Sequence, residues 1–148
     1  MLFPWMRTPL VLGALVAYGA GPLAVQAPAS WVVISRSPAL KVSLDSSRVS
    51  ANSQGTTVWL RFDYGAVNPP MSDMPYAWRR MESRHLIDCG RRRAKDLAMV
   101  IVDTSGVRHD GSQVLSKEWQ AFESHPLTPS VLEPACDTIK RIRSHRGA

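Results

Sequence analysis

The alternation of apolar and polar side chains along residues 57–64 (TVWLRFDY) constrains the fold of this chain more than any other feature of the sequence. Val58, Leu60, Phe62 and Tyr64 occupy every second position, so in an extended backbone they point to one face. The residues between them include an arginine and an aspartate and point to the other face. The segment therefore predicts a strand that buries one face and keeps the other polar.

Shorter patterns of the same kind predict more strands on both sides of this segment. Residues 67–75 (VNPPMSDMP) instead hold three prolines, which cannot donate to a strand ladder, and predict an exposed loop. The turn residues at 103–106 predict a hairpin after an apolar run. The further predicted strands are residues 31–35, 41–45, 77–89, 97–102, the segment from 107 onward and 118–122. Together these segments predict a small antiparallel sheet of about six strands.

The C-terminal stretch changes from a period of two to the spacing of a helix. The residues that recur at this spacing are Cys136, Ile139 and Ile142 or Arg143. Two starts fit the sequence: a capping box from Ser130 to Glu133, or a start at Glu133 with Pro134 as the first helical residue. The fold class predicted for the chain is α+β, with a short C-terminal helix packed on the sheet.

The first 29 residues have the layout of a secretory signal peptide, with a single charge at Arg7 followed by an apolar stretch that glycines and a proline interrupt. Ala27 and Ala29 fit the small-residue rule for cleavage before Ser30. A cut after Ala27 is less favoured because Pro28 would follow the bond, and a retained leader would act as an anchor. We therefore predict a signal peptide at 1–29 and one exported domain at 30–148, with no stable membrane span after cleavage.

Cys89 and Cys136 are the only two cysteines of the chain. An even number of cysteines in an exported protein predicts a disulfide, because the compartments outside the cytoplasm are oxidising. The alternatives are a metal site, which lacks a CxxC or HxxxH pair to complete it, and a reactive thiol, which lacks a histidine nearby in sequence. The predicted bridge ties the end of a strand to the C-terminal helix. The compartment is then the periplasm, the cell surface or the external medium.

Motifs for catalysis or cofactor binding are not found in the sequence. Its four histidines, His85, His109, His125 and His145, show no spacing typical of a metal site, so such a site would need assembly from distant loops. His85 falls on an inward position, which predicts a hydrogen-bonded core histidine. There is no GxSxG motif, and Asp45, Asp63, Asp88 and Asp103 fall on strands or strand ends, where turn-making and arginine pairing account for them. We predict no catalytic residues, no metal, no cofactor and no enzyme activity.

A cluster of basic residues is the strongest functional feature of a chain whose net charge is +6. Clustered guanidinium groups favour sulfates, phosphates and carboxylate-rich partners, but they also serve as solvated sheet faces. No aromatic residue lies between Met81 and Glu118, which argues against nucleic acid, because its binding sites interleave aromatics with positive charge. The candidate binding surface consists of Arg79, Arg80, Arg84, Arg91, Arg92, Arg93 and Lys95.

The order of several short motifs resembles the bacterial surface-adhesin protein E family over nearly the whole chain after the leader. These motifs are Trp31 with two valines, the 58–64 strand, Ile87-Asp88-Cys89 followed by Arg92 and Arg93, the turn at 103–107, Trp119 and Ala135-Cys136. The resemblance implies a small antiparallel sheet joined to a C-terminal helix by the Cys89–Cys136 disulfide. The founding member is an outer-membrane lipoprotein that binds laminin, vitronectin and plasminogen and can dimerise. This chain differs in lacking a cysteine for lipid attachment.

Two functional hypotheses follow. The first is an exported, non-enzymatic binding module that engages an acidic protein or glycan, such as a host matrix component, through its basic face. The second is a periplasmic structural or envelope protein whose sheet edge or apolar loop meets another bacterial protein. Homodimer formation is compatible with either hypothesis.

Overall fold

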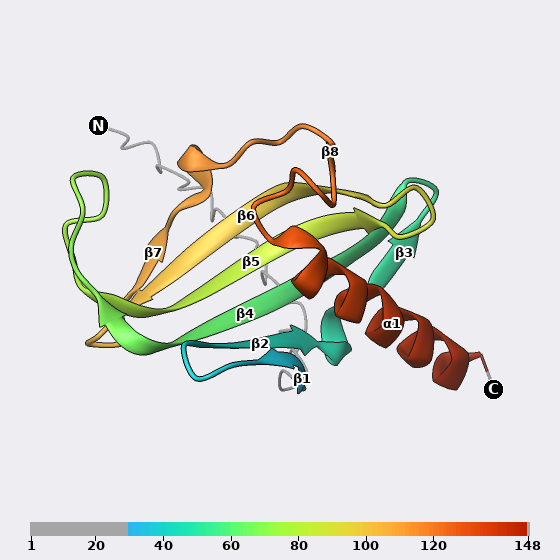
Figure 1. Ribbon diagram of the computed structural model, residues 1–148, viewed down its shortest axis with the longest axis horizontal. Helices are drawn as coiled ribbons and strands as arrows, with labels where there is room; N and C mark the ends of the chain where they lie inside the picture. Colours follow the sequence, from blue (N-terminus) through green and yellow to red (C-terminus); the bar gives the residue numbers. More distant parts are fainter. Residues whose placement is uncertain (1–29, 148) are drawn as a thin grey trace, which may run out of the picture.

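A computed structural model describes residues 30–147 of the chain, so the predicted signal peptide lies outside the described residues. These residues form an antiparallel sheet with one α-helix, α1 (Thr128–Arg146), lying against it (Figure 1). The predicted α+β class with a C-terminal helix is therefore confirmed. None of the helices in residues 30–147 combines the length and apolar character needed to span a membrane.

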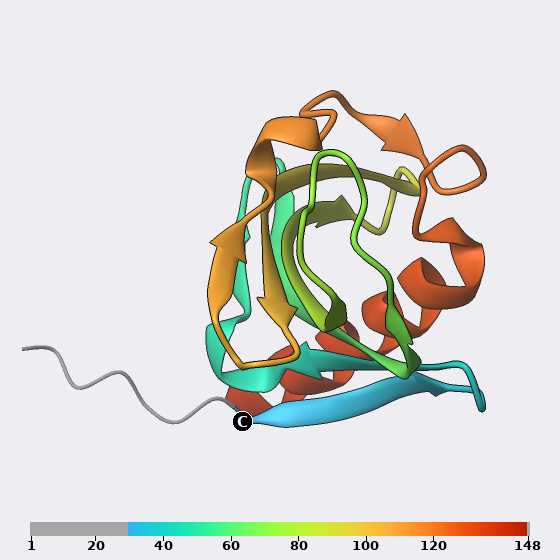
Figure 2. The same cartoon turned by 90° about the vertical axis from the view of Figure 1, so that its left-hand side faces the viewer.

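The sheet has eight strands, of which six form a continuous hydrogen-bonded path in the order β1-β2-β4-β5-β6-β7. Two short strands lie off this path, with β3 pairing to β4 and β8 pairing to β6. Figure 2 shows how strongly the sheet curves when it is seen from one end. The strands are β1 (Trp31–Arg36), β2 (Leu40–Asp45), β3 (Ser50–Asn52), β4 (Gly55–Asn68), β5 (Trp78–Asp88), β6 (Arg93–Asp103), β7 (Arg108–Asp110) and β8 (Gln120–Ala121).

The alternation in β4 determines which face of the sheet meets the helix. Val58, Leu60 and Phe62 are buried in one cluster with Leu132 and Ile139 of the helix. In the register of β4 and β5, these three β4 residues lie opposite His85, Ser83 and Met81. The inward positions predicted for β5 are therefore confirmed, and the two central strands present one continuous face to the core.

The helix begins earlier and runs longer than the sequence predicted. It starts at Thr128, and Pro129 lies in its first turn, where no backbone N–H is needed. Both predicted starts, the Ser130 capping box and Glu133, are wrong, and the helix of 19 residues is not short. Pro134 lies inside the helix and removes one backbone hydrogen bond, a loss offset by burial of the neighbouring Leu132 and Ala135 in the core.

The predicted disulfide is present between Cys89, which follows β5, and Cys136 of the helix. The two Cα atoms are 5.8 Å apart, and 47 positions separate the cysteines in the sequence. Both side chains pack at the margin of the main core. The bridge therefore fixes the helix on the sheet face where its buried residues lie.

Three local features differ from the sequence-based expectation, the first being that β6 begins at Arg93 and not at residue 97. The strand β3 was not predicted, because its three residues are exposed and show no alternation. The strand β4 extends to Asn68, so the proline-rich loop begins later than expected, and an isolated bridge joins Met71 and Met74 within it. Two short 3-10 turns, η1 (Ser46–Arg48) and η2 (Ser112–Val114), connect strands.

Candidate functional site

The face of the sheet that points away from the core carries the candidate binding site. Because Leu60 and Ser83 pair on the core side, the neighbouring pair of Trp59 and Arg84 lies on the opposite face. The next pair on that face is Arg61 and Glu82. The helix packs on the core side, so within residues 30–147 it does not cover this face, on which Arg84 is exposed and Trp59 is half-buried.

Two tryptophans on this face alternate with arginines. The guanidinium of Arg61 lies 4.0 Å from the ring centre of Trp31. That of Arg48, from the η1 turn, lies 5.8 Å from the Trp31 ring and 4.9 Å from the Trp59 ring. At these distances a cation is attracted by the electron-rich face of the indole. These contacts hold the two guanidinium groups next to the indole rings.

A third tryptophan continues this arrangement toward the other side of the sheet. Strand β8 pairs with the start of β6, which places Trp119 beside that strand. The guanidinium of Arg93 lies 4.4 Å from the Trp119 ring centre, and the Lys95 ammonium lies 5.2 Å from it. We call the whole set the tryptophan–cation face. It consists of Trp31, Trp59, Trp119, Arg48, Arg61, Arg84, Arg93 and Lys95.

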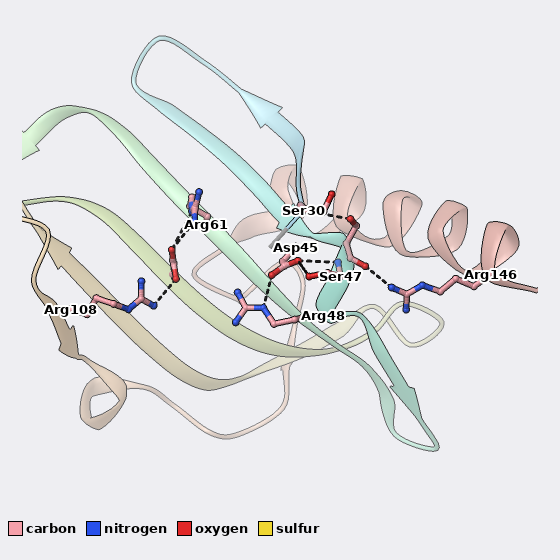
Figure 3. A network of polar contacts seen from close by, with 9 residues as sticks. Ser30, Asp45, Ser47, Arg48, Arg61, Arg108 and Arg146 are labelled. Atoms are coloured by element: carbon pink, nitrogen blue, oxygen red, sulfur yellow. Dashed lines mark hydrogen bonds and ion pairs between the residues drawn. The ribbon is translucent and has the colours of Figure 1, made fainter. Parts of the chain in front are cut away.

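A buried carboxylate anchors the centre of the tryptophan–cation face. Glu82 Oε1 accepts from Arg61 Nη2 at 3.1 Å, and Oε2 accepts from Arg108 Nη2 at 2.7 Å (Figure 3). Burial raises the pKa of Glu82, but the two arginines outweigh it and hold this pKa below its usual value. Glu82 therefore stays ionised at neutral pH and fixes the position of Arg61.

A second buried carboxylate positions Arg48. Asp45 is fully buried, and its oxygens accept from the Ser47 backbone N–H, the Ser47 hydroxyl and Arg48 Nε (Figure 3). The helix end also reaches this turn, because Arg146 Nη2 donates to the Ser46 carbonyl at 2.7 Å. The η1 turn that carries Arg48 is therefore fixed by Asp45 of β2 and by Arg146 at the end of the helix.

The predicted basic cluster does not form one free surface. Arg80 donates to Asp63 at 2.7 Å, and both Arg91 and Arg93 contact Asp88. Arg92 pairs with Glu123 and Glu133 and lies over the Phe122 ring on the helix side. Of the seven predicted residues, those without an ion pair to any residue within 30–147 are Arg79, Arg84 and Lys95.

Sequence spacing missed Trp31, Trp59 and Trp119 because all three lie outside the predicted basic cluster at 79–95. Trp59 enters the site through strand pairing opposite Arg84, and Trp119 enters through the pairing of β8 with β6. The sequence reasoning against nucleic acid used the absence of aromatics between Met81 and Glu118, and the fold supplies aromatics from outside that range. One feature of the sequence could have indicated a tryptophan at this site: Trp59 alternates with the apolar residues of its strand and therefore points to the opposite, polar face.

The predicted core histidine, His85, lies in a buried polar cluster on the other face of the sheet. Its Nε2 is 2.6 Å from the Ser83 hydroxyl, and its Nδ1 is 2.8 Å from Asp96 Oδ1. His125 Nε2 lies 3.3 Å from the same Asp96 oxygen. The burial of His85 is confirmed, but the convergence of two distant histidines on one aspartate was not foreseen.

The contact of Ser83 with His85 has the distance of a nucleophile–base pair. Ser83 lies in the middle of β5, between partners on β4 and β6, so the neighbouring backbone N–H groups are engaged in the sheet. Free N–H groups of the kind that stabilise a tetrahedral oxyanion are therefore not supplied by this strand. Strand β5 by itself therefore completes no acyl-transfer site around Ser83.

No model of a known protein family matches the chain, and no curated protein matches it significantly. The resemblance to the surface-adhesin protein E family therefore stays a prediction.

Proposed function

We propose that this protein is an exported, non-enzymatic binding module that holds an acidic glycan on its tryptophan–cation face. The observation that carries the proposal is the placement of three tryptophans among cations on the open side of the sheet. Flat indole rings offer apolar contact area, and guanidinium groups pair with sulfate or carboxylate in two-pronged geometry. The resemblance to an adhesin family agrees with a binding role toward host matrix components.

Internal pairing determines which cations remain for a ligand. Arg61 is committed to Glu82 and Arg48 to Asp45, so these two arginines mainly hold the tryptophans in place. Arg84 lies opposite Trp59 in the register, is exposed and forms no ion pair within residues 30–147. Arg84 and Lys95 are therefore the cations that we expect to contact the ligand.

The test measures binding of the purified, oxidised protein to heparin and to hyaluronan over a range of salt concentrations. Arg84→Ala is compared with Arg143→Ala, which removes the same charge from an exposed position on the helix. We expect a loss of about tenfold for Arg84→Ala and for Trp59→Ala, the range of a central interface residue. Arg143→Ala is expected to bind like the wild type.

Two results would refute the glycan proposal. Equal losses of affinity for Arg84→Ala and Arg143→Ala would show that only net charge matters, because a ligand bound to the tryptophan–cation face would contact Arg84 and not Arg143. Tighter binding to single-stranded DNA than to heparin at about 0.15 M salt, where exposed charges more than about 8 Å apart are screened, would assign the face to another polyanion.

A second candidate function, an envelope protein with a protein partner, is favoured by the edge strand β1. Val32 and Val33 on this strand are 37% and 44% exposed, and β1 ends the sheet. An edge strand with exposed apolar side chains can pair with a strand of another chain, including a second copy. Affinity capture from its own cells should then recover an envelope protein that Val33→Lys loses and Arg84→Ala retains. Retention by Val33→Lys would exclude pairing at this edge.

A further inference from the structure

Three buried side chains from distant parts of the sequence converge beneath the sheet face that the helix partly covers. His85 comes from β5, Asp96 from β6 and His125 from the segment between β8 and α1. The candidate ligand atoms of the three residues all lie within 4.8 Å of one another. None of the three residues belongs to the tryptophan–cation face.

The polar atoms of this cluster are poorly satisfied by the protein itself. His85 Nδ1 and His125 Nε2 are both buried and lie 2.8 and 3.3 Å from Asp96 Oδ1. In neither case does the oxygen lie where the ring N–H would point, so neither contact is a well-formed hydrogen bond. Two buried imidazole nitrogens without an aligned partner are costly, because burial removes their hydrogen bonds to water.

The arrangement around His85 suits metal binding. When the ring donates from Nε2 to the Ser83 hydroxyl at 2.6 Å, Nδ1 carries a lone pair that is free to bind a metal. A metal-bound histidine usually has such a partner on its other nitrogen, because the partner fixes the tautomer and the ring orientation. Ser83 is therefore a positioning residue for His85.

The hydrogen bond around His125 opposes metal binding, in contrast to the one around His85. The Leu127 backbone N–H lies 3.1 Å from His125 Nδ1, which favours the tautomer with its hydrogen on Nε2. Coordination through Nε2 requires that hydrogen to leave and the Leu127 contact to open. We therefore expect weaker binding than at a structural zinc site in which every ligand has a fixed second partner.

A cavity of about 360 Å³ adjoins the cluster and leaves room for a further ligand. It is lined by the three cluster residues together with Met81, Met99, Leu115 and Gln120, among others. Sites with three protein ligands and an open fourth position are typical of metals that bind water or a small molecule.

We propose that His85 Nδ1, Asp96 Oδ1 and His125 Nε2 bind a divalent late first-row transition metal, of the class that includes Zn²⁺ and Cu²⁺. Two imidazoles and one carboxylate form a donor set that suits these ions. Tetrahedral coordination with bonds of 2.0–2.1 Å separates ligand atoms by about 3.3 Å. The distances from Asp96 Oδ1 to His85 Nδ1 and to His125 Nε2, 2.8 and 3.3 Å, are close to that value.

The test uses untagged, oxidised protein freed of metal with a chelator and then titrated with Co²⁺ and Zn²⁺. We expect visible Co²⁺ absorption bands of tetrahedral coordination, which Zn²⁺ abolishes, and a higher melting temperature with Zn²⁺. Asp96→Asn and His125→Gln should each weaken Zn²⁺ binding about 100-fold, and Ser83→Ala about 10-fold. His109→Gln is the matched control, since His109 pairs with Asp103 at 2.8 Å and no third candidate ligand joins them among residues 30–147.

Several outcomes would overturn the metal site. These are the absence of Co²⁺ bands in the wild type, unchanged Zn²⁺ affinity in folded His125→Gln, or an equal loss of affinity in His109→Gln. If the cluster variants fail to fold, X-ray absorption of the zinc-loaded wild type decides. Two imidazole ligands in its spectrum would support the site, and one or none would exclude it.

Discussion

Breaking the Cys89–Cys136 bridge is the perturbation whose effect can be worked out most directly from the structure. The bridge closes a loop between cysteines 47 positions apart. In the chain-entropy model, closing a loop of this size in the unfolded state contributes about 4 kcal/mol to the free energy of unfolding. A domain of this size has a total stability of about 5–15 kcal/mol, so the loss is a large part of it.

The assay is urea unfolding of three forms: oxidised wild type, reduced wild type and the double variant Cys89→Ala/Cys136→Ala. Reduction breaks the bond but keeps the sulfur atoms that pack at the edge of the core. We therefore expect the reduced wild type to lose about 4 kcal/mol and the double variant slightly more, because it also loses buried side-chain volume.

The comparison also separates the two contributions. A reduced wild type within about 1 kcal/mol of the oxidised form would refute the loop-closure reasoning, because that result leaves no effect of the size that the model requires. A loss seen only in the double variant would assign the stabilisation to packing of the side chains instead of to the covalent bond.

Three further perturbations test the core, the central ion pair and a tight backbone contact. Leu132→Ala, at a helix position with no exposed area, should lower the free energy of unfolding by about 2–5 kcal/mol in urea, and a loss below 1 kcal/mol would contradict its place in the core. Glu82→Gln should cost about 1.5–3 kcal/mol at pH 7, since a charged hydrogen bond to Arg108 is lost. Because the pKa of Glu82 is depressed in the fold, its contribution is present above the pKa of the unfolded chain and is lost as pH falls through the folded value. The stability difference between wild type and Glu82→Gln should therefore stay constant from pH 7 down to the pKa of the unfolded chain and shrink below it, and a difference that stays constant below that pKa would contradict this. Gly55→Ala should lower the melting temperature, because a Cβ there would lie 2.5 Å from the Ile87 carbonyl oxygen, and an unchanged melting temperature would exclude that close contact.

Local patterns in the sequence were sufficient for the longer strands, for the faces that they bury and for the disulfide, but not for the short strand β3. The side-chain period of a strand is a property of the backbone, so the alternation at 57–64 assigns Val58 and Leu60 to the core without any knowledge of their partners. The disulfide followed from the number of cysteines and the expected compartment. The two-residue period of a strand also sufficed to assign His85 an inward position from its own segment.

The start of the helix was not readable, because the usual signals pointed to the wrong residues. Ser130 with Glu133 resembles a capping box, yet no side chain caps the helix where it begins, at Thr128. A helix with a proline at its seventh position loses a hydrogen bond, and only its packing on the sheet offsets this loss. That packing depends on residues far away in the sequence.

By itself, the sequence determined the α+β class: an antiparallel sheet with one apolar face, a C-terminal helix and one disulfide between them. Only the tertiary structure decided which side chains meet. The register between β4 and β5 places Trp59 beside Arg84, and the return of the chain before the helix brings His125 to Asp96. The physical reason is that the alternation of a strand is encoded in adjacent residues. The register between two strands and the path of the segment before the helix depend instead on the packing energy of the whole core.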